Sequence, residues 1–249
     1  SAGLTGLDWG GGILVFWSIA EIRNCHVIGN YGGLNGGGIQ KNCSVLLIED
    51  CLIANNTSSI GGGGIGCAQG GEITISDCVL SENLTTQWGG GIYLASGTVG
   101  SVTGCSIVNN LSQYYGGGIN LGSTPEEQII GGSDSDGNHF HGNWAAVGCD
   151  LAAINADVII NARYNTFSGN FSSDYYVSPQ SRFDLSYCES GLVPIEQDVY
   201  VSISGSDQNT GLSWDQSFLT INQALSVVYG SEANPITIHI GEGVFTAPT

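Results

Sequence analysis

One tetrapeptide, GGGI, occurs five times in this chain at almost constant intervals. The copies lie at residues 10–13, 36–39, 62–65, 89–92 and 116–119, so the successive steps are 26, 26, 27 and 27 residues. Three consecutive glycines lose much backbone freedom on folding, because glycine has the most to lose. A chain that repeats such a sequence at one interval is built from equivalent structural units.

A second motif repeats at the same interval as GGGI. A cysteine stands five residues before an asparagine in four copies, and the stretches NHFHGN and NTFSGN continue the asparagine series in degenerate form. The cysteines are Cys25, Cys51, Cys78 and Cys105, and the asparagines are Asn30, Asn56, Asn83, Asn110, Asn143 and Asn170. The repeats therefore extend over roughly residues 10–172.

Between the landmarks apolar residues alternate, as in Ile73, Ile75, Cys78 and Leu80, which is the period of a strand with one buried face. A unit of this length cannot bury its inner face alone, but stacked units share one core at a spacing of about 4.8 Å. The predicted core ladder is Val27, Ile53, Leu80, Ile107, Phe140 and Phe167. We expect an all-β fold for residues 1–172, a right-handed parallel β-helix of about six coils.

The glycines suit the corners of such coils, where only glycine allows positive φ or close approach of two backbones. A phosphate-binding loop is the rival interpretation, but no copy is followed by Lys and then Ser or Thr.

The end of the chain has a different pattern. Residues 173–197, with Pro179 and Pro194, are predicted to be a linker. Residues 198–249 indicate a strand, a helix and a second strand over 236–240. This cap-like segment is expected to start a further β-helix or to dock on a neighbouring subunit, and both ends of the β-helix are expected to be open. The apolar residues proposed for assembly with a neighbouring subunit are Phe218, Ile221, Leu225, Val228, Ile236, Ile238 and Ile240.

The pairing of GGGI with a short hydrophobic stretch ending in Asn resembles the GGA(I/L/V) and FxxN repeats of chlamydial polymorphic outer membrane proteins. Phe140 before Asn143 and Phe167 before Asn170 match the FxxN form directly, whereas the first four coils have an aliphatic residue in place of Phe. The resemblance implies a secreted or surface-displayed protein with an adhesive or structural role. The C-terminal segment similarly looks like the opening segment of bacterial surface β-helix proteins.

The charge balance excludes two classes of partner. The chain has 22 acidic residues against four basic ones, so it lacks the cations that neutralise nucleic acid or an anionic membrane. No run of about 18 apolar residues predicts a transmembrane segment. Eight cysteines in an acidic chain favour an oxidising, extracellular or cell-surface location.

Catalytic residues are hard to find. Asp50 and Asp77 occupy matching positions in adjacent coils and are the best carboxylate pair for a glycosidase-like reaction. The same spacing arises from any two acids in a ladder, so we expect solvated acids and no enzyme activity. A carbohydrate-binding or carbohydrate-cleaving β-helix is the alternative, and aromatic residues that precede GGGI offer it a contact surface.

Other candidate sites are short motifs. Asp134, Asp136 and Asn138 alternate around a glycine turn and suit calcium, although no cofactor is required for the expected function. The ladder cysteines are expected to be reduced, whereas disulfides are predicted between Cys43 and Cys67 and between Cys149 and Cys188. Among six sequons, Asn42 and Asn55 are the candidate glycan acceptors.

The sequence predicts a structural component of an extracellular filament or stalk, in which copies of the chain join head to tail. Glycans or host-surface ligands are the other partners that an adhesive role implies. Cap-like residues followed at once by a new strand indicate one period of a longer array.

Overall fold

The computed structural model of the chain describes residues 10–122, 128–133, 136–154, 160–167, 175–178, 183–190, 195, 197–206, 209–221, 224 and 235–245. The chain divides into two compact units. The first comprises residues 1–167 and 171–189, and the second comprises residues 168–170 and 190–249.

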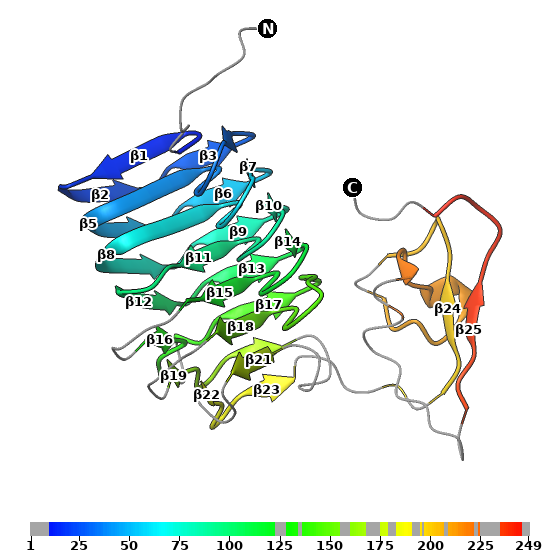
Figure 1. Cartoon of the computed structure of the whole chain (residues 1–249). Helices are drawn as coiled ribbons and strands as arrows, with labels where there is room; N and C mark the ends of the chain where they lie inside the picture. Colours follow the sequence, from blue (N-terminus) through cyan, green and yellow to red (C-terminus); the bar gives the residue numbers. More distant parts are fainter. Residues whose placement is uncertain are drawn as a thin grey trace, which may run out of the picture. The chain divides into compact units, whose positions relative to one another are not determined.

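The first unit is a parallel β-helix, in which the chain winds through three sheets that are parallel throughout (Figure 1). The twelve-stranded sheet contains β1 (Ile13–Phe16), β2 (Ile19–Arg23), β5 (Ile39–Glu49), β8 (Ile65–Ser76), β11 (Ile92–Leu94), β12 (Thr98–Thr103), β15 (Ile119–Leu121), β16 (Ile129–Ile130), β18 (Leu151–Ile154), β19 (Ile160–Asn161), β21 (Tyr175–Ser178) and β22 (Phe183–Asp184). The seven-stranded sheet contains β3 (His26–Ile28), β6 (Leu52–Ala54), β9 (Val79–Ser81), β13 (Ser106–Val108), β17 (His139–His141), β20 (Thr166–Phe167) and β23 (Glu189–Ser190). The four-stranded sheet contains β4 (Tyr31–Gly32), β7 (Thr57–Ser58), β10 (Leu84–Thr85) and β14 (Leu111–Ser112).

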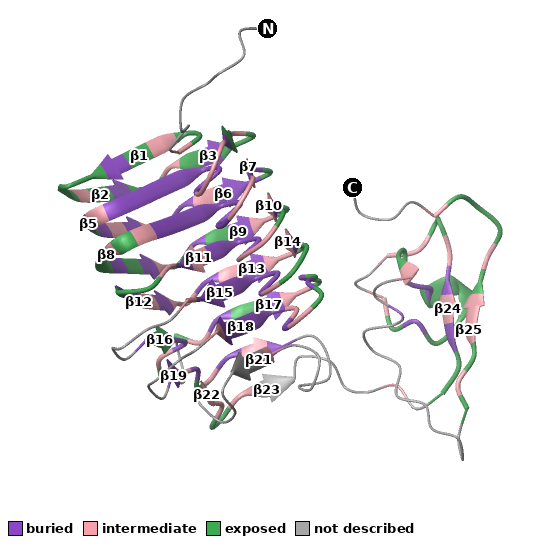
Figure 2. Cartoon of the chain, viewed as in Figure 1, coloured by how far each residue is buried: buried purple, intermediate pink, exposed green. Residues whose placement is uncertain are grey.

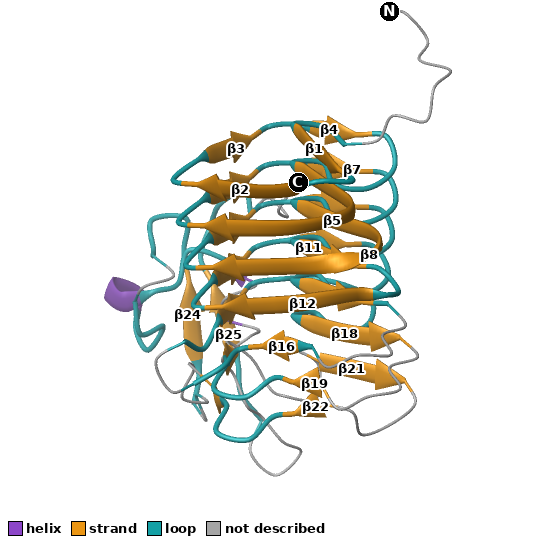
Figure 3. Ribbon diagram, turned by 90° about the vertical axis from the view of Figure 1, so that its left-hand side faces the viewer, coloured by secondary structure: helices purple, strands orange, loops and turns teal. Residues whose placement is uncertain are grey.

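The core of the β-helix is the predicted apolar ladder. Val27 pairs with Ile53, and the register continues one coil at a time to Phe140 and Phe167. Each member of the ladder is at most 5% exposed, and the Phe140 and Phe167 rings stack with their centroids 5.1 Å apart. Buried segments run through the coils from β1 to β18 in Figure 2, and Figure 3 shows the strands stacked side by side. The predicted strand pattern and fold class are confirmed.

Each GGGI corner needs glycine for two different reasons, which coil two illustrates. Gly36 has a φ of +62°, a left-handed conformation that glycine adopts without a Cβ clash. A Cβ on Gly37 would lie 2.4 Å from the carbonyl oxygens of both Gly63 and Thr57, so the backbones approach too closely for a side chain. The corner interpretation is confirmed.

From β3 to β17, a turn follows each strand of the seven-stranded sheet. We call the stack of these turns the Asn turn, after the residues Asn30, Asn56, Asn83, Asn110 and Asn143. From Asn56 to Asn143, each Oδ1 accepts the backbone N–H and the Nδ2–H of the asparagine one coil earlier, as Asn83 does from Asn56 at 3.1 Å for both. Each of these Nδ2 groups also donates to a carbonyl of the preceding coil, as Asn83 does to Ile53 at 2.9 Å, whereas Asn30 Nδ2 donates to Ile28 of its own coil. The predicted asparagine ladder is thus fully hydrogen-bonded through Asn143; Asn170 lies outside the described residues.

A second stack of turns comes just before the same strands. We call it the Cys turn, and its residues are Cys25, Cys51, Cys78, Cys105, Asn138, Asn165 and Cys188. Here one sulfur atom serves both as hydrogen-bond acceptor and as donor. The Cys51 backbone N–H donates to the Cys78 Sγ at 3.4 Å, and the Cys78 thiol donates to the carbonyl of Ser76 at 3.1 Å. In the lower coils Asn138 replaces the thiol: its Oδ1 accepts the Cys105 N–H at 3.0 Å and its Nδ2 donates to Val102 at 2.9 Å.

The coils continue beyond the predicted boundary at residue 172. β21 pairs with β18, β22 with β19 and β23 with β20, so the seven-stranded sheet has seven rungs instead of the six predicted. Much of the supposed linker 173–197 is therefore the last coil. Its repeat was missed because the coil has no GGGI, although Phe183 and Leu185 still pack against the core.

The second unit is a small strand–crossover–strand structure. β24 (Val199–Val201) pairs in parallel with β25 (Ile238–Ile240), and the 3₁₀ helix η1 (Trp214–Gln216) lies in the connection. Val199, Val201, Phe218 and Ala224 form its core. Most of the predicted helix is outside the described residues, but Ala224 donates its N–H to the Thr220 carbonyl, as in a helical turn.

Candidate functional site

The most unusual surface of the β-helix belongs to its first coil. Six of the 18 large hydrophobic side chains that are exposed in the described residues lie between positions 14 and 31. They are Leu14, Phe16, Trp17, Ile19, Ile28 and Tyr31. We call these six residues the first-coil patch. Phe16 is 54% exposed and Ile19 is 84% exposed, whereas Asn42, the register partner of Phe16 in the next coil, is fully buried.

The backbone of the first coil is also open. Within the described residues, β1 and β2 pair only with β5, and β3 pairs only with β6. At the other end β21, β22 and β23 likewise have one partner each. An unpaired edge presents N–H and C=O groups that another strand can satisfy. The strands at the two ends run in the same direction, so the last coil of one copy could pair in parallel with the first coil of another.

A second surface follows the Cys turn, where the residue just before a turn residue is exposed in several coils and is a glycine in the coils of Cys105 and Asn138. Asp50 and Asp77, the candidate carboxylates, stand there with φ of 53° and are exposed. Tyr164 and Tyr187 occupy the same place in the last coils, and their rings stack with centroids 4.9 Å apart. We call this line of four residues the exposed turn edge. The acids do lie on neighbouring rungs, but on an exposed turn.

An ion pair supports the tyrosine end of that edge. Arg163 donates to Asp184 Oδ2 from Nε at 2.7 Å. These hydrogen bonds, together with those from Ser186, hold the pKa of Asp184 well below its usual range. The pair joins consecutive coils beside the stacked rings.

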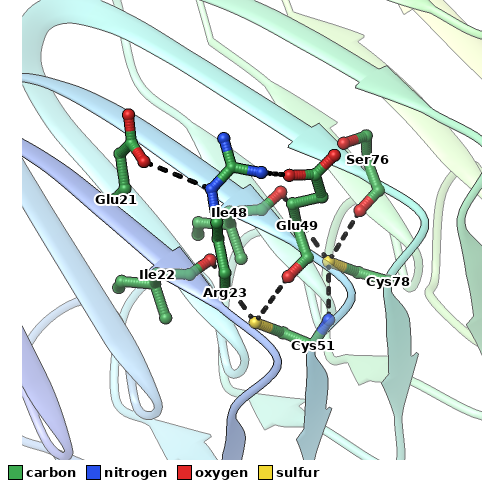
Figure 4. A network of polar contacts seen from close by, with 8 residues as sticks. All are labelled: Glu21, Ile22, Arg23, Ile48, Glu49, Cys51, Ser76 and Cys78. Atoms are coloured by element: carbon green, nitrogen blue, oxygen red, sulfur yellow. Dashed lines mark hydrogen bonds and ion pairs between the residues drawn. The ribbon is translucent and has the colours of Figure 1, made fainter.

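A further polar network lies beside the Cys turn at the first coils (Figure 4). Arg23 of β2 bridges Glu21 in its own coil, at 3.2 Å from Nε, and Glu49 in the next coil. Beneath it the Cys51 and Cys78 thiols donate to backbone carbonyls. The network holds coils together and offers no open coordination site.

The predicted calcium site does not assemble as expected. Asn138 is fully buried and its side chain is used in the Cys turn, so it cannot serve as a ligand. Asp136 is exposed and accepts a hydrogen bond from Ser133 at 2.8 Å. Asp134 lies outside the described residues, and no cluster of three or more potential metal ligands occurs within them.

The two predicted disulfides are absent. All eight cysteines are described, and none is joined to another. Cys67 pairs in register with Lys41, not with Cys43, because Cys43 follows its GGGI by two residues more than Cys67 does. Cys149 lies at the glycine corner, whereas Cys188 belongs to the Cys turn and donates to Ala162 at 3.0 Å. The glycine corner and the Cys turn lie at opposite ends of the path that each coil takes through the twelve-stranded sheet, so these two cysteines are far apart.

The two glycan candidates differ in exposure. Asn42 is fully buried on β5 and its Oδ1 accepts from Gln40 at 2.7 Å, so it cannot be an acceptor in the folded protein. Asn55 is exposed in a left-handed turn, which leaves its amide open to modification.

The proposed assembly residues of the second unit are mostly internal. Phe218 is 2% exposed, and Ile221 and Ile238 pack against the same core, so these side chains stabilise the unit itself. Ile240 is 50% exposed and Ile236 is half-buried. Leu225 and Val228 lie outside the described residues.

Sequence reasoning missed three members of the Cys turn: Asn138, Asn165 and Cys188. The signal was present, since Asn138 and Asn165 each begin a six-residue stretch that ends in Asn, as the ladder cysteines do. It also missed the first-coil patch, because strand periodicity does not tell how far an outward-facing side chain is exposed.

Comparison with known proteins agrees with the architecture. A family model described as the right-handed beta helix region matches residues 3–134, which is more than half of the chain. The chain therefore belongs to the right-handed β-helix family, and the predicted hand is confirmed. Such scaffolds occur in surface proteins and in proteins that act on carbohydrates. The search of curated proteins found no match, and the search of solved structures found none either. No helix among the described residues is long and apolar enough to span a membrane.

Proposed function

We propose that this protein is a non-catalytic structural component of an extracellular or cell-surface filament or stalk, whose copies associate head to tail. The observation that carries the proposal is the first-coil patch on an open parallel edge. Exposed large apolar side chains that gather on one coil favour an interaction surface. Here it borders strands whose backbone groups have partners on one side only, within the described residues.

The opposite end supplies a matching edge. β21 of one copy would extend the sheet beside β1 of the next, β22 would lie beside β2, and β23 beside β3, so that the parallel register continues. Such a contact is heterologous, and it generates an open filament when the rotation does not close. The second unit would then begin a further β-helix or dock on a neighbouring subunit.

The repeat chemistry supports a surface protein of the polymorphic outer membrane protein type. The GGGI motif forms the corners, and the FxxN motif places Phe140 in the core with Asn143 in the Asn turn. Both motifs therefore serve the architecture, which fits a stalk better than a catalytic role. An adhesive function toward glycans or host-surface ligands would use the exposed sides of the coils.

The test is self-association of the full chain. Sedimentation velocity over a range of concentrations, followed by electron microscopy, is expected to show oligomers that lengthen with concentration. The double variant Phe16→Lys with Ile19→Lys places charges on the patch and is expected to abolish association. Val79→Lys is the matched control, because Val79 is 41% exposed on a central coil and should leave association unchanged. A wild-type chain that stays monomeric at every concentration contradicts the proposal.

A second candidate, carbohydrate binding, is favoured by the exposed turn edge. The stacked rings of Tyr164 and Tyr187, next to the ion pair of Arg163 and Asp184, offer both apolar and hydrogen-bonding contacts to a sugar. Binding to a glycan array that disappears in Tyr187→Ala, together with a reducing-sugar assay, would distinguish binding from cleavage. Asp50→Asn with Asp77→Asn should leave binding at the tyrosines intact and would remove any hydrolysis.

A further inference from the structure

Lys41 is an unusual residue for the interior of a β-helix. Its side chain is fully buried on β5, stacked in register between Val15 of the first coil and Cys67 of the third. The ion pairs seen in the described part of the chain do not include it. Its Nζ donates instead to the carbonyl oxygen of Gly70. A buried amine without a carboxylate is costly as the charged form.

Cys43 follows Lys41 by two residues on the same strand, β5. It lies at a β-bulge between Asn42 and Ser44, where this one residue of β5 faces Gln69 and Gly70 of β8, and it has a φ of 47°. The bulge turns its thiol toward the third coil, where Sγ donates to the Gln69 carbonyl at 2.9 Å. Lys41 Nζ and Cys43 Sγ are thus held on the carbonyls of two consecutive residues. Unlike Cys67, Cys43 is only half-buried, so a small oxidant can reach it.

The turn that receives both groups is shaped for them. Gln69, Gly70 and Gly71 are three successive residues in the left-handed region, with φ of 60°, 72° and 80°. A Cβ on Gly71 would lie 3.1 Å from Lys41 Nζ, which shows how closely the amine fits against the backbone. Burial lowers the pKa of Lys41, while the electrostatic influence of Cys67, Cys43 and Glu72 acts against that shift. The amine is therefore available as a nucleophile more readily than an exposed lysine.

We infer that Lys41 and Cys43 form a reversible covalent modification site, a sulfenamide link between Nζ and Sγ that forms under peroxide. Hydrogen peroxide first oxidises the Cys43 thiol to a sulfenic acid and is itself reduced to water. The Nζ lone pair then attacks Sγ. The S–N bond forms, the S–O bond breaks, and the leaving hydroxide takes a proton from nitrogen to become water. The link prevents further oxidation of Cys43, and an added thiol reverses it by attack on sulfur.

The experiment treats the full chain with peroxide and maps the peptides by mass spectrometry under acidic conditions. The peptide with residues 41–43 is expected to be lighter by about 2 Da, the loss of two hydrogens. Lys41 should then resist amine labelling in the unfolded chain, and dithiothreitol should restore both the mass and the labelling. Cys188 is the internal control: it is also half-buried, but no lysine stands beside it, so it should form a dimedone adduct.

Two variants make the test specific. Cys43→Ser should keep Lys41 reactive toward the amine reagent after peroxide treatment. Lys41→Met keeps an apolar chain of similar length in the core, and Cys43 should then proceed to sulfinic acid; circular dichroism checks that both variants fold. A Cys43–Cys67 disulfide also removes two hydrogens but leaves the Lys41 amine reactive, and that result overturns the proposal. Sulfinic acid at Cys43 in the wild-type chain, or a link from Lys41 to Cys67, overturns it equally.

Discussion

The Asn turn and the Cys turn flank the same seven-stranded sheet and use the same hydrogen-bonding scheme with different side chains. In both, the backbone N–H of a turn residue donates to the side chain one coil later. In both, that side chain donates back to the carbonyl three residues before the turn residue: Asn110 to Leu80 at 2.9 Å, and Asn138 to Val102 at 2.9 Å. Cysteine meets the same demand with longer contacts, such as Cys105 Sγ to Ile75 at 3.8 Å.

The difference shows what each turn requires. A carboxamide has separate donor and acceptor atoms, so an asparagine satisfies two neighbours fully and also bonds the next asparagine. A thiol is a weak donor and a weak acceptor on one atom, and it behaves chiefly as a small apolar residue. The Asn turn should therefore stabilise the fold through its hydrogen bonds, and the Cys turn should stabilise it through the packing of its side chains.

The largest effect is expected at the centre of the Asn turn. Asn83→Ala removes the acceptor of the Asn56 N–H and Nδ2 and the donor to Ile53. Three buried polar groups lose their partners, so the free energy of unfolding should fall by about 3–5 kcal/mol. Urea denaturation followed by circular dichroism measures it. A loss below about 1 kcal/mol would show that water replaces the side chain and would remove the proposed distinction between the turns.

Truncation at the Cys turn should be milder. Cys78→Ala removes one buried sulfur and three weak hydrogen bonds, at a cost of about 1–2 kcal/mol in the free energy of unfolding. The same denaturation assay applies, with Asn83→Ala as the reference. If the two variants are equally unstable, sulfur hydrogen bonds matter as much as carboxamide ones.

Alkaline pH should distinguish the two turns, because only thiols titrate. Burial raises the pKa of Cys51, and the hydrogen bond with Cys105 together with burial raises that of Cys78. The unfolded thiols, with a pKa of about 8.5, lose protons first, so stability should fall as pH rises above that value, by at most about 1.4 kcal/mol per pH unit per thiol. Lys41, with its lowered pKa, acts in the opposite direction up to the unfolded lysine pKa.

The test compares how the denaturation midpoints of the wild-type chain and of Cys78→Asn change between pH 7 and 10. Because Lys41 is present in both proteins, its contribution cancels in the difference. The variant should lose less stability than the wild-type chain over this range. Parallel pH curves would mean that the Cys78 thiol keeps the same pKa on unfolding.

The smallest effect is expected for that exchange itself at neutral pH. Cys78→Asn should change the free energy of unfolding by less than about 1 kcal/mol, since Asn138 and Asn165 already occupy the Cys turn in the lower coils. Asn83→Cys, the reverse exchange, should cost about 2 kcal/mol, because the Asn turn would lose its separate donor. A destabilised Cys78→Asn protein would show that the upper coils are too tightly packed for a carboxamide.

Sequence periodicity predicted the coils because each repeat fixes its own register. GGGI marks a corner by backbone sterics, and the alternating residues between landmarks mark the buried face, so the ladder from Val27 to Phe167 followed directly. The last coil was missed because it has no glycine corner. The Cys43–Cys67 disulfide was wrong because Cys67 pairs in register with Lys41, two residues before Cys43. Burial of Asn42 depends on neighbouring coils, which no local pattern records.

The backbone hydrogen bonds between coils have a mechanical consequence. Bonds such as Gly36 N–H to Gly61 and Ile39 N–H to Gly64 point from one coil to the next, along the axis of the solenoid. Tension applied along that axis loads a few of these bonds at a time, so coils should peel off singly instead of rupturing together. Each detached coil of 26 or 27 residues releases about 90 Å of chain. A stalk built this way would respond to a sudden pull by lengthening in steps of nearly equal size, and each step would dissipate part of the applied energy.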